Sequence, residues 1–82
     1  MLIPYTCTTT VFVNAPIDVL EGAAFEQLPR EILEDPTIEL EQMQTLSNDV
    51  CDGVYQGEII ITMSTKRNFG EPVPSGFYME GL

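Results

Sequence analysis

The carboxylates are the side chains of this sequence best suited to chemistry, because thirteen of its 82 residues are acidic. Two carboxylates can serve as general acid and general base, but only in a pocket that separates their pKa values. The chain contains no histidine, so it can form no Ser–His or Cys–His pair and has no imidazole metal ligand. Most of its acids fall on a predicted outward helix face. We therefore expect no catalytic residues and no enzymatic activity.

The sequence matches none of the metal-binding and cofactor-binding motifs considered below. Segment 48–53 suggests a calcium loop, but aligning Gly53 with the EF-hand glycine puts Ile59 where the bidentate glutamate is required. Neither a Walker pattern nor a Rossmann glycine triplet occurs. The two cysteines, Cys7 and Cys51, cannot make a zinc site alone. The sequence leaves open whether they are two reduced thiols or a disulfide. We expect no metal and no cofactor.

The charge balance indicates what the protein can attract. Three basic and thirteen acidic residues give a net charge of −10 and a pI near 4.1. Such a field repels nucleic acid and anionic membranes and attracts basic surfaces. Arg30, Lys66 and Arg67 are too few to bind phosphates against this background. An alternative interpretation is that the acidity only keeps the protein soluble.

Eight of the acids fall in one run between residues 18 and 41, interrupted by the single basic residue Arg30. If a helix and the next strand present them together, the surface would resemble a row of phosphates. The hypothesis is a partner-binding acidic face; the alternative is a solvated helix face. The residues are Asp18, Glu21, Glu26, Glu31, Glu34, Asp35, Glu39 and Glu41.

The C-terminal segment from Phe69 onward is rich in glycine and proline and has apolar residues without periodicity. Such segments often become ordered on a partner. Its expected anchors are Phe77, Tyr78, Met79 and Leu82, since aromatic residues and methionine are enriched at interfaces. The alternative is that the segment folds back over an open sheet edge.

Two elements are expected in the first half of the chain. Residues 5–13 are dense in β-branched and aromatic types. Alternation puts Tyr5, Cys7, Thr9, Val11 and Val13 on the core face of a strand, and Thr6, Thr8, Thr10 and Phe12 on the other face, whose threonines we expect to contact water. A helix begins near Pro16, with Ile17, Leu20, Ala24 and Leu28 as its apolar stripe. Pro29 should kink or restart it, with a short second turn over 30–34.

The second half is expected to supply two strands. Residues 37–46 fit either a strand or a helix, and the alternation of Ile38 and Leu40 with glutamates leads us to choose a strand. Residues 47–49 and Asp52-Gly53 indicate turns. Residues 57–65 contain three consecutive isoleucines, which suggest a strand buried on both faces or nearly so.

These elements predict an α+β fold: a small three-stranded sheet in β-α-β-β order, one kinked helix on one face, and an irregular C-terminal tail. The expected division is a single domain over 1–68 and an extended tail over 69–82. No apolar stretch is long enough to span a bilayer and the start lacks a basic region, so we expect a cytoplasmic protein.

The sequence therefore predicts a small acidic protein-binding module. In composition, though in no motif, it resembles phage-encoded inhibitors that block nucleic-acid-handling enzymes, and this likeness implies a larger partner with a basic surface. The first alternative is a structural or accessory subunit of an assembly, docked through its tail. A second is a thiol-based regulator using Cys7 and Cys51, although neither cysteine has a nearby cation to stabilise a thiolate.

Overall fold

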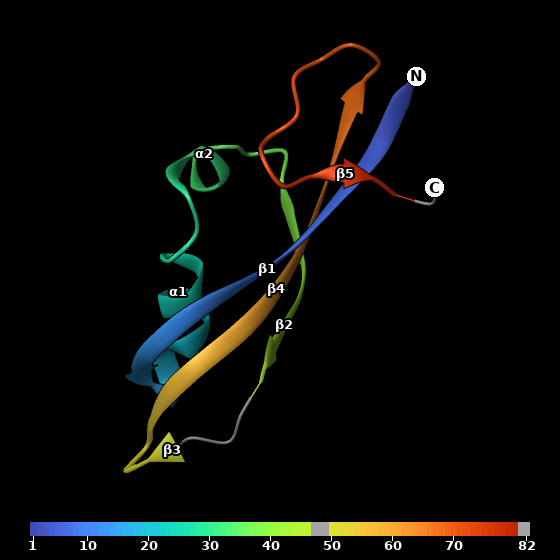
Figure 1. Cartoon of the computed structure of the whole chain (residues 1–82). Helices are drawn as coiled ribbons and strands as arrows, with labels where there is room; N and C mark the ends of the chain where they lie inside the picture. Colours follow the sequence, from blue (N-terminus) through green and yellow to red (C-terminus); the bar gives the residue numbers. More distant parts are fainter. Residues whose placement is uncertain (47–49, 81–82) are drawn as a thin grey trace.

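Two fifteen-residue strands form the spine of the molecule. The computed structural model describes residues 1–46 and 50–80, and in it β1 (Leu2–Pro16) pairs antiparallel with β4 (Val54–Asn68) over their full length. The pair is long and twisted (Figure 1). The molecule is correspondingly elongated, with extents of 49 × 25 × 16 Å. Strand was predicted for both segments, and each strand is longer at both ends than expected.

The remaining strands lie on the two sides of this pair, in the order β2-β4-β1-β5. β2 (Glu39–Thr45) pairs antiparallel with β4, with a register shift between Leu40 and Gln42, so the choice of a strand there is confirmed. β3 (Val50–Cys51) also pairs with β4, and β5 (Tyr78–Met79) pairs with β1. Over residues 1–46 and 50–80, the sheet thus has five strands. The prediction of three was wrong because a two-residue strand leaves no periodicity to detect.

Short helices form a second layer along β1 (Figure 1). They are a 3₁₀ turn, η1 (Ile17–Val19), followed by α1 (Leu20–Phe25) and α2 (Arg30–Leu33). Pro29 separates α1 from α2 and directly precedes the first residue of α2. The expected single kinked helix is therefore two separate helices. Ala24, Leu28 and Ile32 are buried, whereas Ile17 is half exposed and does not join the predicted stripe.

The core lies between the helices and one face of the sheet. Cys7 and Val13 of β1 are buried there, as the alternation predicted, and Ala15, which lies beyond the predicted strand, is buried with them. β4 adds Tyr55, Ile59, Ile61 and Met63, the four largest fully buried side chains. Ile60 points to the opposite face and is half-buried, so helices cover only one face of β4. The prediction of a strand buried on both faces or nearly so therefore holds fully for one face only, because no helix of the described residues packs over the second face.

The C-terminal segment lies back against the sheet. Besides the β5 pairing, the amide of Glu80 donates to the carbonyl oxygen of Pro4 (3.1 Å), and the amide of Ser75 donates to a carboxylate oxygen of Glu31 in α2 (3.1 Å). Pro74 is buried and Phe77 packs against the core. The segment thus adds a strand beside the start of β1, while the division at residue 68 stays a prediction. Over the described residues, none of the helices is both long and apolar enough to cross a membrane.

Candidate interaction surfaces

The side of the sheet opposite the helices is here called the open face. Side chains alternate along a strand and directly paired antiparallel residues point the same way, so Thr6, Thr8, Thr10 and Phe12 of β1 share this face with their partners in β4. Thr8, Thr10 and Phe12 are exposed and Thr6 is half-buried. The expectation that the threonine face contacts water is confirmed for these residues.

Apolar and hydroxyl side chains both occur on the open face. Phe12 is 59% exposed and Tyr78, which pairs with Thr6, is 60% exposed. Thr6 pairs with Tyr78 on one side and with Ser64 on the other, and Thr8 and Thr10 lead along β1 from Thr6 to Phe12. The hydroxyl of Thr6 donates to the carbonyl oxygen of Met63 (3.2 Å). Short hydroxyl side chains thus separate two exposed aromatic rings.

Acidic residues border this face. Glu58 pairs with Phe12, and Glu39 pairs with Ser64. The hydroxyl of Ser64 donates to Glu41, which follows Leu40 at the register shift of β2. Because Ser64 points to the open face, this bond places the Glu41 carboxylate there as well. Glu39 and Glu41 of the edge strand thus both lie at Ser64.

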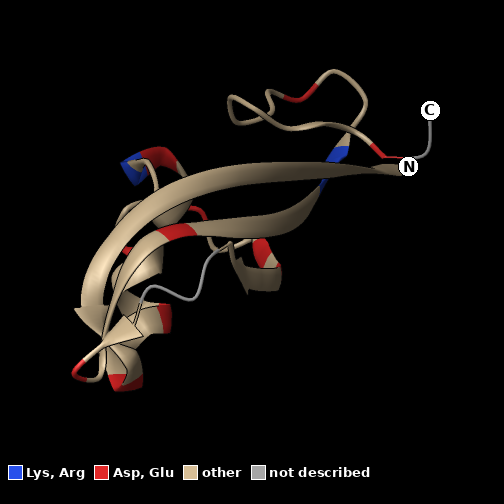
Figure 2. Ribbon diagram, turned by 60° about the horizontal axis from the view of Figure 1, so that its bottom comes forward, with Lys and Arg blue, Asp and Glu red and all other residues tan. Residues whose placement is uncertain are grey.

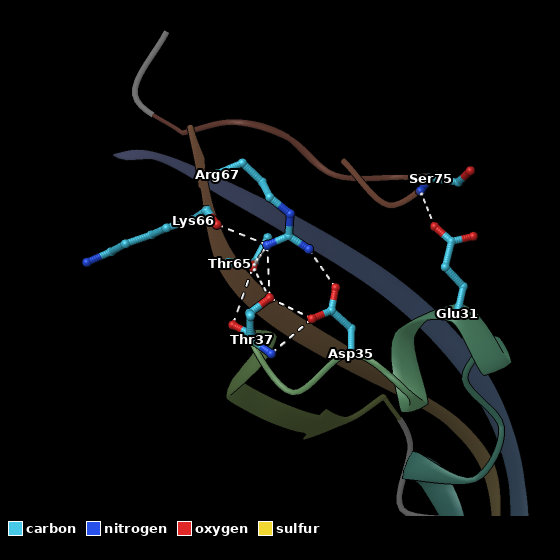
Figure 3. Close-up of polar contacts among 7 residues, drawn as sticks. All are labelled: Glu31, Asp35, Thr37, Thr65, Lys66, Arg67 and Ser75. Carbon is cyan, nitrogen blue, oxygen red and sulfur yellow. Dashed lines mark hydrogen bonds and ion pairs between the residues drawn. The ribbon is translucent and has the colours of Figure 1, made fainter. Parts of the chain in front are cut away.

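A hollow of about 790 Å³ lies on the open face near the start of β1. Leu2 and Pro4 line it with apolar surface, and Glu39, Glu41 and Glu80 line it with carboxylates. Lys66 is the basic residue of its lining, and its side chain points away from the cluster around Arg67 (Figure 3). Three carboxylates around one amine leave the hollow negatively charged.

The eight acids predicted as one face divide into three groups. Figure 2 shows acidic residues spread over the helices, the sheet and the loops, without a single row. One group is exposed on the layer formed by η1, α1 and α2, a second lies on the open face, and Asp35 is bound internally. The first group is Asp18, Glu21, Glu26, Glu31 and Glu34, and the second is Glu39 and Glu41.

Asp35 belongs to a polar cluster between the loop after α2 and the end of β4 (Figure 3). Its carboxylate accepts hydrogen bonds from the amide (2.9 Å) and the hydroxyl (2.6 Å) of Thr37 and forms an ion pair with Arg67 (2.5 Å). Arg67 also donates to the hydroxyl of Thr65 (2.6 Å). The hydrogen bonds from Thr37, together with Arg67, lower the pKa of Asp35. The negative charge of Asp35 is therefore balanced within the molecule by Arg67.

The four predicted tail anchors have different surroundings. Phe77 is half-buried and packs against the core, so its ring is partly used within the chain. Tyr78 and Met79 keep 60% and 40% of their surface exposed. Leu82 lies outside the described residues. The role of these residues in partner binding stays a prediction.

The cysteines are two separate free thiols. Cys7 is buried in the middle of the sheet, and burial raises the pKa of its thiol. Cys51 is exposed in β3, with the Asp52 carboxylate as its polar neighbour. The surroundings of Cys7 therefore do not favour a thiolate. Among residues 1–46 and 50–80, no group of three or more His, Cys, Asp and Glu side chains is arranged to hold a metal ion.

Sequence reasoning did not identify the open face as a surface of interest. It assigned none of Glu58, Phe12 and Glu80 to a site. One signal was available, since alternation had already placed Phe12 with the threonines on the face away from the core. The position of Glu80 depends on the β5 pairing, which carries no local signal.

Comparison with known proteins yields no relative. No family model matches the chain, and neither a curated protein nor a solved structure is significantly similar to it.

Proposed function

We propose that this protein is a small protein-binding module that attaches to a basic surface of a larger protein. One observation carries the proposal: the chain neutralises few of its own acids. Of its three basic residues, Arg67 is paired with Asp35 and Arg30 with Glu34 (3.6 Å). The other described acids are without an ion-pair partner among the described residues. A surface of this kind attracts cationic partners and accelerates encounter with them.

A protein that normally holds nucleic acid in a basic groove is the kind of partner we favour. The field of this protein would repel nucleic acid and compete with it for the same cations. Five exposed acids on the helical layer and four acids around the open face offer negative charge on both sides of the molecule. An inhibitor that occupies such a groove needs no catalytic group.

The test is recovery of partners from the native host on the immobilised protein, followed by affinity measurements with the purified partner. We expect the affinity to fall steeply between about 0.05 M and about 0.5 M salt, because exposed charges are screened over this range. We also expect duplex DNA or RNA to compete for the partner. An affinity indifferent to salt, or a partner without a basic surface, would contradict the proposal.

A second candidate is an accessory subunit of a larger assembly, docked through the C-terminal segment. The exposed side chains of Tyr78 and Met79 favour it, since such residues are enriched at interface centres. Under this function, Tyr78→Ala with Met79→Ala abolishes association, while doubling the salt concentration changes little. Under the first function, salt has the larger effect.

A further inference from the structure

We propose that the partner docks on the open face of the sheet, and that a lysine or arginine side chain of the partner enters the hollow beside β2. This inference rests on the proposed function and specifies its contact surface. The occupant is a protein surface with an apolar centre surrounded by basic residues. The helical layer is then the side that faces away from the partner.

The shape and composition of the open face support this choice. It extends over β2, β4, β1 and β5, and helices cover only the other side of the sheet (Figure 1). Phe12 and Thr6, the neighbour of Tyr78, are six residues apart on one strand, a separation of about 20 Å at 3.3 Å per residue. Two exposed aromatic rings at that spacing can act as anchors near opposite ends of one interface.

The side chains between the two rings lose little conformational entropy when the surface binds a partner. Threonine and serine have few rotatable bonds, and Ser64 and Thr6 already form hydrogen bonds within the sheet. Less side-chain entropy is therefore lost on binding than on a surface of lysine or glutamate. The backbone beneath them is a regular ladder over fifteen residue pairs. The face is thus held in shape before the partner arrives.

Charge decides between the possible occupants. Glu39, Glu41, Glu58 and Glu80 lie on or beside the open face, with Lys66 as the basic residue of the hollow. A second copy of the chain would bring the same carboxylates against them, and like charges at an interface are strongly unfavourable. Nucleic acid is repelled for the same reason. A basic protein surface complements the face.

The hollow gives the partner a specific contact. Glu39, Glu41 and Glu80 line it, so carboxylates come from an edge strand and from the C-terminal segment. A guanidinium or ammonium group placed among them would gain charge-assisted hydrogen bonds. Leu2 and Pro4 would contact the aliphatic part of the same side chain. This combination of acid and apolar lining suits lysine and arginine.

The experiment maps a defined basic probe on the full chain by NMR. The probe is a short synthetic peptide of lysines and arginines around one tryptophan, and its control has every basic residue replaced by glutamate. Backbone amide shifts are followed during titration at low and high salt. The helical layer has five exposed acids and the border of the open face has four, so attraction by charge alone would not select the open face.

Two pairs of variants test the assignment, and within each pair the two variants make the same change in charge and in side-chain size. Glu39→Gln with Glu41→Gln is compared with Glu21→Gln in α1 and Glu26→Gln directly after it, and Phe12→Ala is compared with Phe25→Ala at the end of α1. An amide spectrum of each variant confirms that it is folded. We expect the open-face variants to weaken probe binding roughly tenfold and the α1 variants to change it less than about twofold.

The outcomes separate the two proposals. Saturable shifts in Thr6, Thr62 and Ser64 that vanish in the open-face variants support the inference. Shifts confined to α1 and α2, or equal losses in both sets of variants, overturn the docking surface and leave the proposed function standing. If the probe produces no saturable shifts at low salt, or shifts that salt does not weaken, both proposals fail.

Discussion

Arg67 connects the loop after α2 to the end of β4 through Asp35, Thr37 and Thr65. Its side chain and that of Asp35 are only 13% and 18% exposed, whereas the side chains of the Arg30–Glu34 pair are 88% and 69% exposed. The two ion pairs have the same chemistry in different surroundings. An exposed pair contributes little because water screens it and its side chains must be ordered, while a largely buried partner left alone is costly.

Removing Arg67 should therefore destabilise the protein more than removing Arg30. We expect Arg67→Ala to lower the free energy of unfolding by about 1–3 kcal/mol, because Asp35 and Thr65 lose a charged donor in a partly buried site. Arg30→Ala should change it by less than about 0.5 kcal/mol. Urea unfolding followed by circular dichroism measures both values. Equal effects of the two substitutions would show that the cluster adds no stability of its own.

Asp35 should also make stability depend on pH in the acid range. Its pKa is lowered in the folded protein by the hydrogen bonds of Thr37 and by Arg67, so the unfolded chain binds a proton more readily. The resulting stabilisation is complete above about pH 4, the ordinary pKa of aspartate, and is lost as pH falls through the lowered folded pKa. Urea unfolding at several pH values should show wild type exceeding Asp35→Asn at neutral pH and matching it at the acid end.

At the scale of elements, the hairpin between β3 and β4 has the most demanding backbone. Cys51 pairs with Val54 across a two-residue loop, and both loop residues have positive φ, 53° at Asp52 and 74° at Gly53. Two successive positive φ values define the turn that matches the twist of a hairpin. The carbonyl oxygen of Gly53 also accepts a hydrogen bond from the amide of Ile17 at the start of η1 (2.9 Å). The turn therefore supports the helical layer as well.

Alanine substitutions at two glycines should have opposite effects. Gly53→Ala should destabilise the protein by about 1 kcal/mol, because a side chain disfavours the left-handed conformation even where space is open. Gly22→Ala, inside α1 and also in open space, should stabilise it by about 0.5–1 kcal/mol through helix propensity. Thermal unfolding of the two variants tests the pair. A stabilising Gly53→Ala would contradict the turn geometry.

Prediction from the sequence succeeded where a pattern repeats within one element. The run of β-branched residues in β1 predicts a strand, and the alternation of Cys7 and Val13 with Thr8 and Phe12 gives its correct core face. The partner of Arg67 was beyond reach because Asp35 lies far from it in sequence and is brought near by the β4 pairing. β5 was missed for a related reason: its two residues are extended because the edge of β1 is beside them. The acidic residues were predicted to point outward. The periodicity of a sequence does not show, however, whether an outward side chain lies on the helical layer or on the open face of the sheet.

At the scale of the whole molecule, the C-terminal segment closes over the core beside Cys7. Gly76, at φ 90°, lies so near that a side-chain carbon built on it would stand 3.4 Å from the Cys7 sulfur. Phe77 packs against the same core, and the pairing of β5 with Tyr5 and Thr6 continues the contact. The segment thus acts as a cover for one buried thiol.

Loosening that cover should expose Cys7 to thiol reagents. In a Cys51→Ser background, which removes the exposed thiol, we expect Phe77→Ala to raise the labelling rate of Cys7 roughly tenfold or more, since about 1.4 kcal/mol of lost packing gives that factor in local opening. Phe69→Ala, at a ring that is 90% exposed, is the matched control and should leave the rate unchanged. Equal rates in both variants would mean that the segment does not protect the thiol.

The pairing of β1 with β4 has a consequence for how the chain is made. During synthesis, β1 leaves the ribosome as an uncharged, β-branched segment whose main partner, Val54–Asn68, has not yet been translated. Such a segment is prone to join other extended chains while it waits. The carboxylates encoded between β1 and β4 emerge before β4 does and place negative charge on the nascent chain. They would therefore slow aggregation of nascent chains on the polysome before the protein meets a partner.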